Sequence, residues 1–183
     1  MAGPAERTDA QVVRDILDGD RDSFRVLVRR YGDVLYSHAF RMVGNPDEAA
    51  DLVQRAFLTG FKKLASARDP ERIGAWLFRI LSNLAKDQLR SPRARELSLD
   101  RVPEIPEARD DPLEAVHLEE FRTRLQVAMG RLTPEQREAF TLKHVEGRSY
   151  EEMAAVLDLS VASLKMRVHR AREALKDLLE EYR

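Results

Sequence analysis

Apolar side chains recur at intervals of three and four residues through almost the whole chain, and this spacing constrains the fold more than any other feature. It matches an α-helix, whose buried face returns every ~3.6 residues. The sequence has no sustained alternation of apolar and polar residues, the pattern typical of a half-buried strand. We therefore expect an all-α fold.

Three helices are expected in the first half of the chain, over residues 20–43, from 46 to about 64, and from 73 to 90. The turn between the first two has the features of a helix start. Asn45 is placed to cap the helix, Pro46 takes its first position, and Glu48 stands where a capping box requires an acid.

A stretch rich in proline and acids divides the chain. Residues 91–116 hold four basic and seven acidic side chains and are interrupted by Pro92, Pro103, Pro106 and Pro112. This composition is typical of a flexible connection. We expect two small helical domains, residues 1–91 and 117–183, joined by a linker over residues 92–116. A linker that is partly helical or docked remains an alternative, because several of its residues are apolar.

Composition excludes several classes of protein. The 183-residue chain has a net charge of −1 and no cysteine, which rules out disulfides and thiolate metal sites. The N-terminus does not resemble a secretory signal, and no apolar run approaches the ~20 residues that cross a bilayer. The four histidines lack zinc-site spacing, and no glycine-rich phosphate loop is present. We expect a cytoplasmic protein that is not an enzyme and has no membrane insertion, metal or cofactor.

Residues 149–175 have the plan of a helix-turn-helix. Ser149 and Glu152 form a capping box for a short helix, and Ser160 is placed to cap the next helix. Asp158 is the candidate for the left-handed residue of the turn, a conformation that Asp tolerates better than most residues.

The helix after this turn separates an apolar stripe from a basic face. A basic helix by itself is usually a solvated surface, but the preceding capped helix and tight turn favour duplex DNA binding. Cations would contact phosphates, and the exposed centre would contact base edges in the major groove. The candidate residues are Ser163, Lys165, Met166, Arg167, His169, Arg170 and Arg172.

A second candidate surface lies on the helix that ends near Arg90. Its residues recur at intervals of four, three, four, three and four: Arg72, Trp76, Arg79, Asn83, Lys86 and Arg90. An aromatic ring and an amide among cations are typical of a platform for unpaired bases. Trp76 has a core position as its alternative, and a Trp side chain can serve both roles.

Two motifs together resemble the extracytoplasmic-function sigma factors. The first half contains GNPDEAADLVQRAFLTGFKKL and AWLFRILSNLAKDQLR, which resemble conserved region two of that family. The second contains LTPEQREAFTLKHVEGRSYEEMAAVLDLSVASLKMRVHRAREAL, which resembles region four. The resemblance runs from about residue 10 to the C-terminus.

The resemblance implies a mechanism and partners. A protein of this family binds the clamp and flap regions of bacterial core RNA polymerase and directs the enzyme to promoter DNA. The helix from Trp76 to Lys86 and the loop over residues 66–74 would hold the opened minus-ten element, and the last helix would read the minus-thirty-five duplex. Family members are often held by an anti-sigma factor. Polymerase contacts are expected at Asp51, Leu52, Gln54, Arg55 and Leu58. Leu58 is included because it is a leucine among charged residues on the outward face of its helix.

The chain departs from the family pattern at several positions. Arg55 stands where an acid usually follows the glutamine, which reverses a charge in the expected polymerase contact. Asp158 replaces a frequent glycine, and Met166 replaces a frequent serine in the reading face. A stand-alone helix-turn-helix regulator is the first rival hypothesis, but it leaves the stripe around Trp76 and Asn83 unexplained. A helical scaffold is another, and it would tolerate changes at Asn83 and Arg170.

Overall fold

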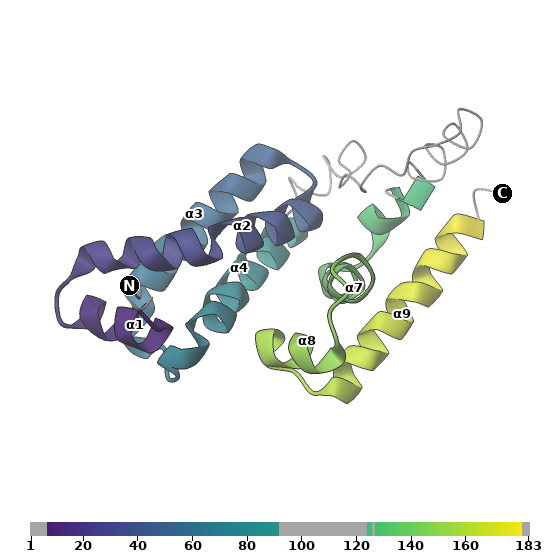
Figure 1. Ribbon diagram of the computed structural model, residues 1–183. Coiled ribbons are helices and arrows are strands. Elements are labelled where there is room, and N and C mark those ends of the chain that lie inside the picture. Colours follow the sequence, from purple (N-terminus) through teal and green to yellow (C-terminus); the bar gives the residue numbers. More distant parts are fainter. Residues whose placement is uncertain (1–6, 92–123, 126, 181–183) are drawn as a thin grey trace, which may run out of the picture.

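The computed structural model describes residues 7–91, 124–125 and 127–180. All regular structure in these residues is helical, which confirms the expected fold class. Helices α1–α4 form an N-terminal bundle, and helices α7–α9 form a C-terminal bundle beside it (Figure 1). The expected linker, residues 92–116, lies outside the described residues, so its conformation and the proposed domain limits stay predictions.

The N-terminal bundle is built around three long helices. Its helices are α1 (Asp9–Leu17), α2 (Phe24–Val43), α3 (Pro46–Lys63) and α4 (Ile73–Arg90), with 3₁₀ turns at Arg21–Ser23, Leu64–Ser66 and Pro70–Arg72. The Asn45 side chain accepts a hydrogen bond from the Glu48 amide, which confirms the predicted cap of α3. Gly60 lets α3 approach α4 closely, because a Cβ there would lie 2.6 Å from Cδ2 of Leu77.

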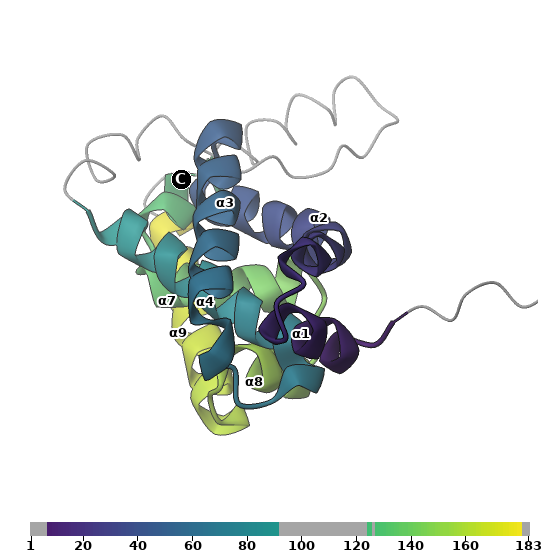
Figure 2. The same cartoon turned by 90° about the vertical axis from the view of Figure 1, so that its left-hand side faces the viewer.

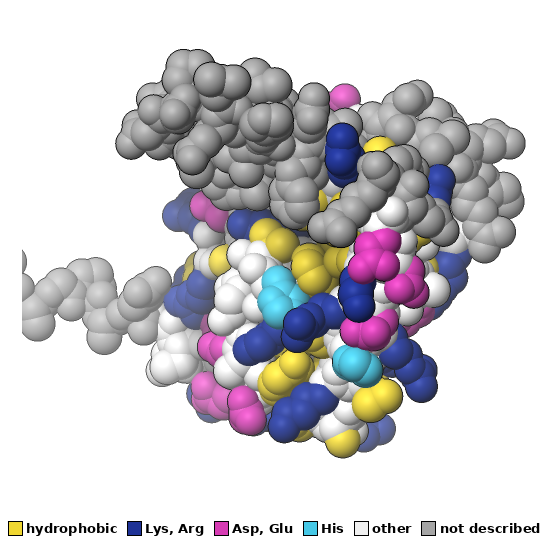
Figure 3. Space-filling model, turned by 90° about the vertical axis from the view of Figure 1, so that its right-hand side faces the viewer, with side chains coloured by type: hydrophobic (Ala, Val, Ile, Leu, Met, Phe, Trp, Pro, Cys, Tyr) yellow, Lys and Arg dark blue, Asp and Glu magenta, His cyan; other side chains and the backbone are white. Residues whose placement is uncertain are grey.

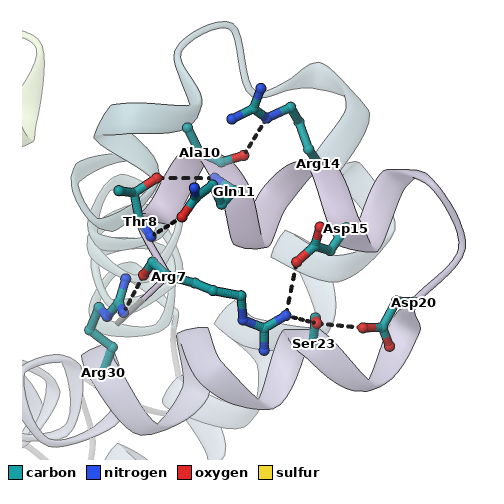
Figure 4. A network of polar contacts seen from close by, with 9 residues as sticks. All are labelled: Arg7, Thr8, Ala10, Gln11, Arg14, Asp15, Asp20, Ser23 and Arg30. Atoms are coloured by element: carbon teal, nitrogen blue, oxygen red, sulfur yellow. Dashed lines mark hydrogen bonds and ion pairs between the residues drawn. The ribbon is translucent and has the colours of Figure 1, made fainter. Parts of the chain in front are cut away.

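The first helix, α1, was missing from the sequence prediction. A capping box between Thr8 and Gln11 starts it, and its inner face buries Val12, Val13 and Ile16. Polar contacts then tie it to the start of α2 (Figure 4). The Arg7 guanidinium donates to Asp15 and to Ser23, both at 2.8 Å. The local signal was present in the sequence as Thr-Asp-Ala-Gln before an apolar repeat.

The C-terminal bundle contains the predicted helix-turn-helix. Residues 124–125 and 127–131 are helical. They are followed by α7 (Pro134–Phe140), a π-helical turn (Thr141–Val145), α8 (Tyr150–Leu157) and α9 (Val161–Glu180). The capping box at Ser149 confirms the predicted helix start, and a second capping box at Thr133 begins α7.

The turn between α8 and α9 also follows the prediction. Asp158 has a φ of 59° and a ψ of 46°, which is the left-handed conformation. The Ser160 hydroxyl accepts a hydrogen bond from the Ser163 amide at 3.2 Å and so caps α9. These local bonds set the angle at which α9 leaves α8.

The two bundles pack against each other rather than only being tethered. Helix α4 contacts both α7 and α8 (Figures 1 and 2). One buried apolar cluster runs from α1–α4 into the C-terminal bundle, where it includes Leu142, Met153 and Leu164. The surface of α4 that faces the second bundle is therefore part of a shared core.

Candidate nucleic-acid interface

The predicted stripe on α4 forms one continuous surface with unequal exposure. Arg72 and Asn83 are exposed, while Trp76 and Arg79 are half-buried. The Lys86 side chain is only 12% exposed. Its exposure is low because the C-terminal bundle covers one flank of the stripe.

A pocket of about 410 Å³ lies at the N-terminal end of this stripe. Its walls come from the loop over residues 66–69, from Arg72, Trp76 and Arg79, and from Ala155 of α8 and Asp158 of the turn that follows it. Trp76 also packs against the buried apolar cluster. Trp76 therefore contributes to the core and also lines the pocket, while its role as a platform for unpaired bases stays a prediction.

The outer face of α9 is open. Lys165, His169, Arg170 and Arg172 are exposed, and Met166 is 49% exposed. Ser163 and Arg167 are partly buried. Lys and Arg side chains gather on the face of the molecule that α9 presents (Figure 3). The opposite stripe holds the helix in place through Leu164, Val168, Ala171 and Leu175, which are buried.

A tyrosine that the sequence analysis did not identify organises cations next to this face. The ammonium groups of Lys143 and Lys165 lie 4.8 Å and 5.7 Å from the ring centre of Tyr150. Such cation–π contacts hold long side chains in defined positions. Burial, assisted by the charges of Arg172 and Lys143, lowers the pKa of the nearby His144. This shift favours the uncharged form of His144.

The outer face of α3 presents four of the five residues expected to contact the polymerase. Asp51, Gln54 and Arg55 are exposed, and Leu58 is 53% exposed. Leu52 is fully buried, which corrects its assignment as a contact residue. Its helical position points into the core, so it supports the surface from below. Arg55 lies 3.4 Å from Asp51, and this exposed pair partly balances the unusual charge of Arg55.

A largely apolar groove of about 630 Å³ adjoins this face between α2 and α3. Leu58 lines it together with Val28 and Tyr36, which are 39% and 38% exposed. The exposure of Val28 and Tyr36 in the groove extends the candidate protein-contact surface beyond α3.

Several charged residues between the bundles carry polar contacts that the sequence analysis missed. Glu138 is fully buried, accepts a hydrogen bond from Ser82 and lies 3.0 Å from the Lys86 ammonium. The Arg148 guanidinium lies 5.1 Å from the ring centre of Phe78. Nothing in the local sequence distinguishes these residues from ordinary surface charges, which are usually exposed.

Glu146 forms the centre of another such contact. One of its carboxylate oxygens lies 2.8 Å from Nδ1 of the buried His38 and 3.6 Å from Arg41, and the other accepts from Arg148 at 3.0 Å. Burial by itself would raise the pKa of Glu146, but hydrogen bonds and charges from His38 and Arg148 outweigh it and hold that pKa below its usual value.

The described residues offer neither a metal site nor a membrane span. No group of three or more His, Asp and Glu side chains among them is arranged to hold a metal ion. Within the same part of the chain, no helix is both long enough and apolar enough to cross a membrane.

Comparisons with known proteins identify two conserved regions in the chain. Residues 27–96 match the family model for Sigma-70 region 2, and residues 122–175 match that for Sigma-70, region 4. These matches cover most of α2, all of α3 and α4, and most of the C-terminal bundle. Both motifs thus match the regions that the sequence analysis assigned to them.

Two solved structures are similar in fold. The structure of CnrH in complex with the cytosolic domain of CnrY has a TM-score of 0.62 and 30% identity, covering 94% of this chain and 97% of that chain. The sigma factor RpoE, in complex with the anti-sigma factor NepR from Bartonella quintana, has a TM-score of 0.57 and 30% identity, covering 87% of this chain and 98% of that chain.

Curated relatives are similar along nearly the whole sequence. The ECF RNA polymerase sigma factor SigE of Mycolicibacterium smegmatis is 34% identical over 87% of this chain, which spans 63% of that relative. The ECF RNA polymerase sigma-E factor of Escherichia coli is 32% identical over 94% of this chain and 95% of its own length. Because that identity extends across both bundles, the chain belongs to the extracytoplasmic-function (ECF) family of RNA polymerase sigma factors.

Proposed function

We propose that this alternative sigma factor directs bacterial core RNA polymerase to promoters with two separate DNA surfaces. The observation that carries the proposal is that one chain has both an open basic helix after a helix-turn-helix and a cationic stripe with Trp76 beside a pocket. A regulator that reads duplex DNA alone would need only the first of these surfaces. Opening a promoter requires contacts to unpaired bases as well.

Helix α9 is proposed to read the minus-thirty-five duplex. Lys165, Arg167 and Arg172 border the buried stripe and would contact phosphates on either side of the major groove. The exposed centre of the helix would face base edges through Ser163, Met166, His169 and Arg170. Phosphate contacts would supply salt-dependent affinity, and each good base contact would supply about 1–3 kcal/mol of discrimination.

Helix α4 is proposed to hold the minus-ten element as a single strand. Trp76 would stack on a base, and the adjoining pocket would receive a base turned out of the strand. Asn83, exposed on the same stripe, would read a base edge. Arg72, Arg79 and Lys86 would follow the backbone.

The outer face of α3 is proposed to dock on the polymerase clamp. Asp51, Gln54 and Arg55 supply its charges and amide, and Leu58 supplies an apolar contact continuous with the groove. An exposed leucine at the border of an apolar groove is typical of a protein interface. The flap of the polymerase would contact the sigma factor elsewhere.

Other roles follow from membership of a family of transcription factors. We propose that the chain is not an enzyme and works in the cytoplasm, where the polymerase acts. We also propose an anti-sigma partner, because the related sigma factor RpoE has been solved with the anti-sigma factor NepR.

The test is transcription by core RNA polymerase, with and without this protein, on a library of host promoter fragments. We expect discrete transcripts that require the protein and are lost with Asn83→Ala or Arg170→Ala. Lys176→Ala is the matched control on α9, because Lys176 is exposed beyond the proposed reading face. Tight duplex binding by the protein alone, with no transcripts, would instead identify a conventional regulator.

A further inference from the structure

The first residue of α1 makes a polar contact that the proposed DNA surfaces do not use. The side chain of Asp9 is only 14% exposed. Its carboxylate accepts hydrogen bonds from the Tyr31 hydroxyl and from the Arg30 guanidinium, and both donors lie on α2. Arg30 also donates to the Arg7 carbonyl at 3.0 Å (Figure 4). A carboxylate removed from water needs such partners, and here they fix the start of α1 to one point on α2.

The ring of Tyr31 extends from this contact to the start of α4. Gly74 is the second residue of α4 and precedes Trp76 by two positions. A Cβ at Gly74 would lie 2.7 Å from Cζ and 2.9 Å from the hydroxyl oxygen of Tyr31. Any larger residue would displace the ring, because a packed interior leaves no room for such an overlap. The start of α4 therefore packs on a ring whose hydroxyl end is held by Asp9.

Helix α1 also supports the loop that forms one wall of the pocket beside Trp76. It contacts the 3₁₀ turns Leu64–Ser66 and Pro70–Arg72, which flank residues 67–69 on both sides. The second turn is capped by Asp69, whose side chain accepts a hydrogen bond from the Glu71 amide at 3.1 Å. Both ends of the loop and the start of α4 thus depend on where α1 is held.

The hydrogen bond between Tyr31 and Asp9 persists at neutral pH. Burial, together with the hydrogen bond to Asp9 and its charge, raises the pKa of Tyr31, although the charge of Arg30 opposes this. The hydroxyl therefore keeps its proton and donates it to the carboxylate. Because the acceptor is ionised, this bond is stronger than one between neutral groups. It is a firm link between α1, α2 and the start of α4.

We propose that Asp9 and Tyr31 are positioning residues for minus-ten recognition, because they hold the walls of the pocket in the geometry that receives an unpaired base. The proposal rests on the proposed role of the pocket beside Trp76. Neither residue is among those that line this pocket, so both act through Gly74 and the turns that α1 contacts. A small displacement of well-oriented groups removes much of their effect. Loss of the link should therefore reduce selectivity for the minus-ten base.

Fluorescence tests the position of the pocket walls without DNA. Trp76 is the single tryptophan of the chain, so its emission reports on the pocket directly. Tyr31→Phe keeps the ring and removes the hydroxyl, and it should raise acrylamide quenching of the free full-length protein about twofold. Asp15→Asn is the matched control, because it removes the ion pair of α1 with Arg7 and leaves Tyr31 untouched. Unchanged quenching in Tyr31→Phe, or an equal rise in the control, overturns the proposal.

Transcription by the polymerase bound to this protein tests selectivity. A promoter from the fragment library is given a randomised minus-ten element and a matching barcode in the transcribed region. Tyr31→Phe should lower the preference for the favoured base at the pocket position by about fivefold, the effect of one weak base contact. Preferences in a randomised minus-thirty-five element should not change. A fall in transcription that is equal for all minus-ten sequences would show only a structural role and overturns the proposal.

Three further variants separate positioning from folding. Asp9→Asn should retain more selectivity than Asp9→Ala, because its amide oxygen still accepts from the Tyr31 hydroxyl. Gly74→Ala keeps the hydroxyl but displaces the ring, so it should reproduce both effects of Tyr31→Phe. Circular dichroism checks that each variant is folded. If Tyr31→Phe folds poorly, the comparison of Asp9→Asn with Asp9→Ala decides, and equal selectivity of these two overturns the proposal.

The proposed function and the positioning role can fail separately. If Trp76→Ala and Asn83→Ala abolish transcription while Tyr31→Phe changes neither quenching nor base preference, only the positioning role fails. If Trp76→Ala and Asn83→Ala leave transcription and its base preference intact, the role of α4 itself fails.

Discussion

The replacement Arg137→Met tests how strongly one buried guanidinium holds the molecule together. Arg137 is 8% exposed and donates to the carbonyls of Met129 at 3.0 Å, Gly130 at 2.9 Å and Met42 at 2.9 Å. Burial lowers its pKa to about 10, so the group stays charged at neutral pH. Met keeps much of the side-chain volume and removes all three donors.

The size of the effect follows from these bonds. A hydrogen bond to a charged group contributes about 1.5–3 kcal/mol. The bond to Gly130 is only part-buried and counts for less, and removing a buried charge returns some desolvation free energy. We expect a net loss of about 3 kcal/mol in the free energy of unfolding. For a chain of this size this corresponds to a fall in Tm of about 9 °C.

Urea and thermal unfolding followed by circular dichroism measure this loss. Arg137→Lys should be intermediate, because an ammonium keeps the charge but cannot reach three carbonyls with a planar fork. Arg170→Met, at an exposed position of α9, is the control and should change stability by less than about 0.5 kcal/mol. A loss below about 1 kcal/mol for Arg137→Met, or full stability of Arg137→Lys, would refute the reasoning.

Three further predictions address pH, packing and DNA binding. The pKa of Glu146 is held below its usual value in the folded protein, so the unfolded chain takes up this proton first as pH falls. The stabilisation of the folded protein is therefore present above the usual glutamate pKa and is lost as the pH falls through the lower pKa of the folded state. Glu146→Gln should flatten this part of the acid-unfolding profile. An unchanged profile would contradict the assignment. Gly60→Ala should lower the free energy of unfolding by about 1–3 kcal/mol in a urea titration, because its Cβ would meet the buried leucine of α4. Gly32→Ala on α2, with open space around it, should be neutral or stabilising. Equal effects of the two variants would count against close packing of α3 on α4. In anisotropy titrations on a minus-thirty-five duplex, Arg172→Ala should reduce the slope of log binding constant against log salt concentration by about one. Met166→Ala should alter the base preference and leave this slope unchanged. The reverse result would exchange the roles of the two residues.

Some features of the candidate surfaces could be predicted because their cause lies within a few residues. The order of Arg72, Trp76 and Asn83 along one helical face is a property of the sequence spacing, as is the separation of Arg170 from the buried stripe of α9. Exposure could not be predicted in the same way. Lys86 belongs to the same stripe as Asn83, yet it is nearly buried because a distant helix covers that flank.

Assignments that needed tertiary information were less successful. Leu52 was proposed as a contact residue, but it belongs to the core because its side chain points inward. Val28 lies on the long helix α2, and no local signal in the sequence shows that it lines an exposed groove. The spacing of residues on one helix defines its faces, and the neighbouring helices decide which face is covered.

The sequence by itself determined most of the helices, their local caps and the helix-turn-helix. Thr133, Ser149 and Asp158 act through bonds to residues three or four positions away, so their roles are visible without the rest of the molecule. Only the tertiary structure decided where the buried charges go. Ser82 and Glu138 are separated by 56 residues, and His38 and Glu146 by 108. A charged side chain is buried only when a partner compensates its desolvation, and the fold alone brings such distant partners together.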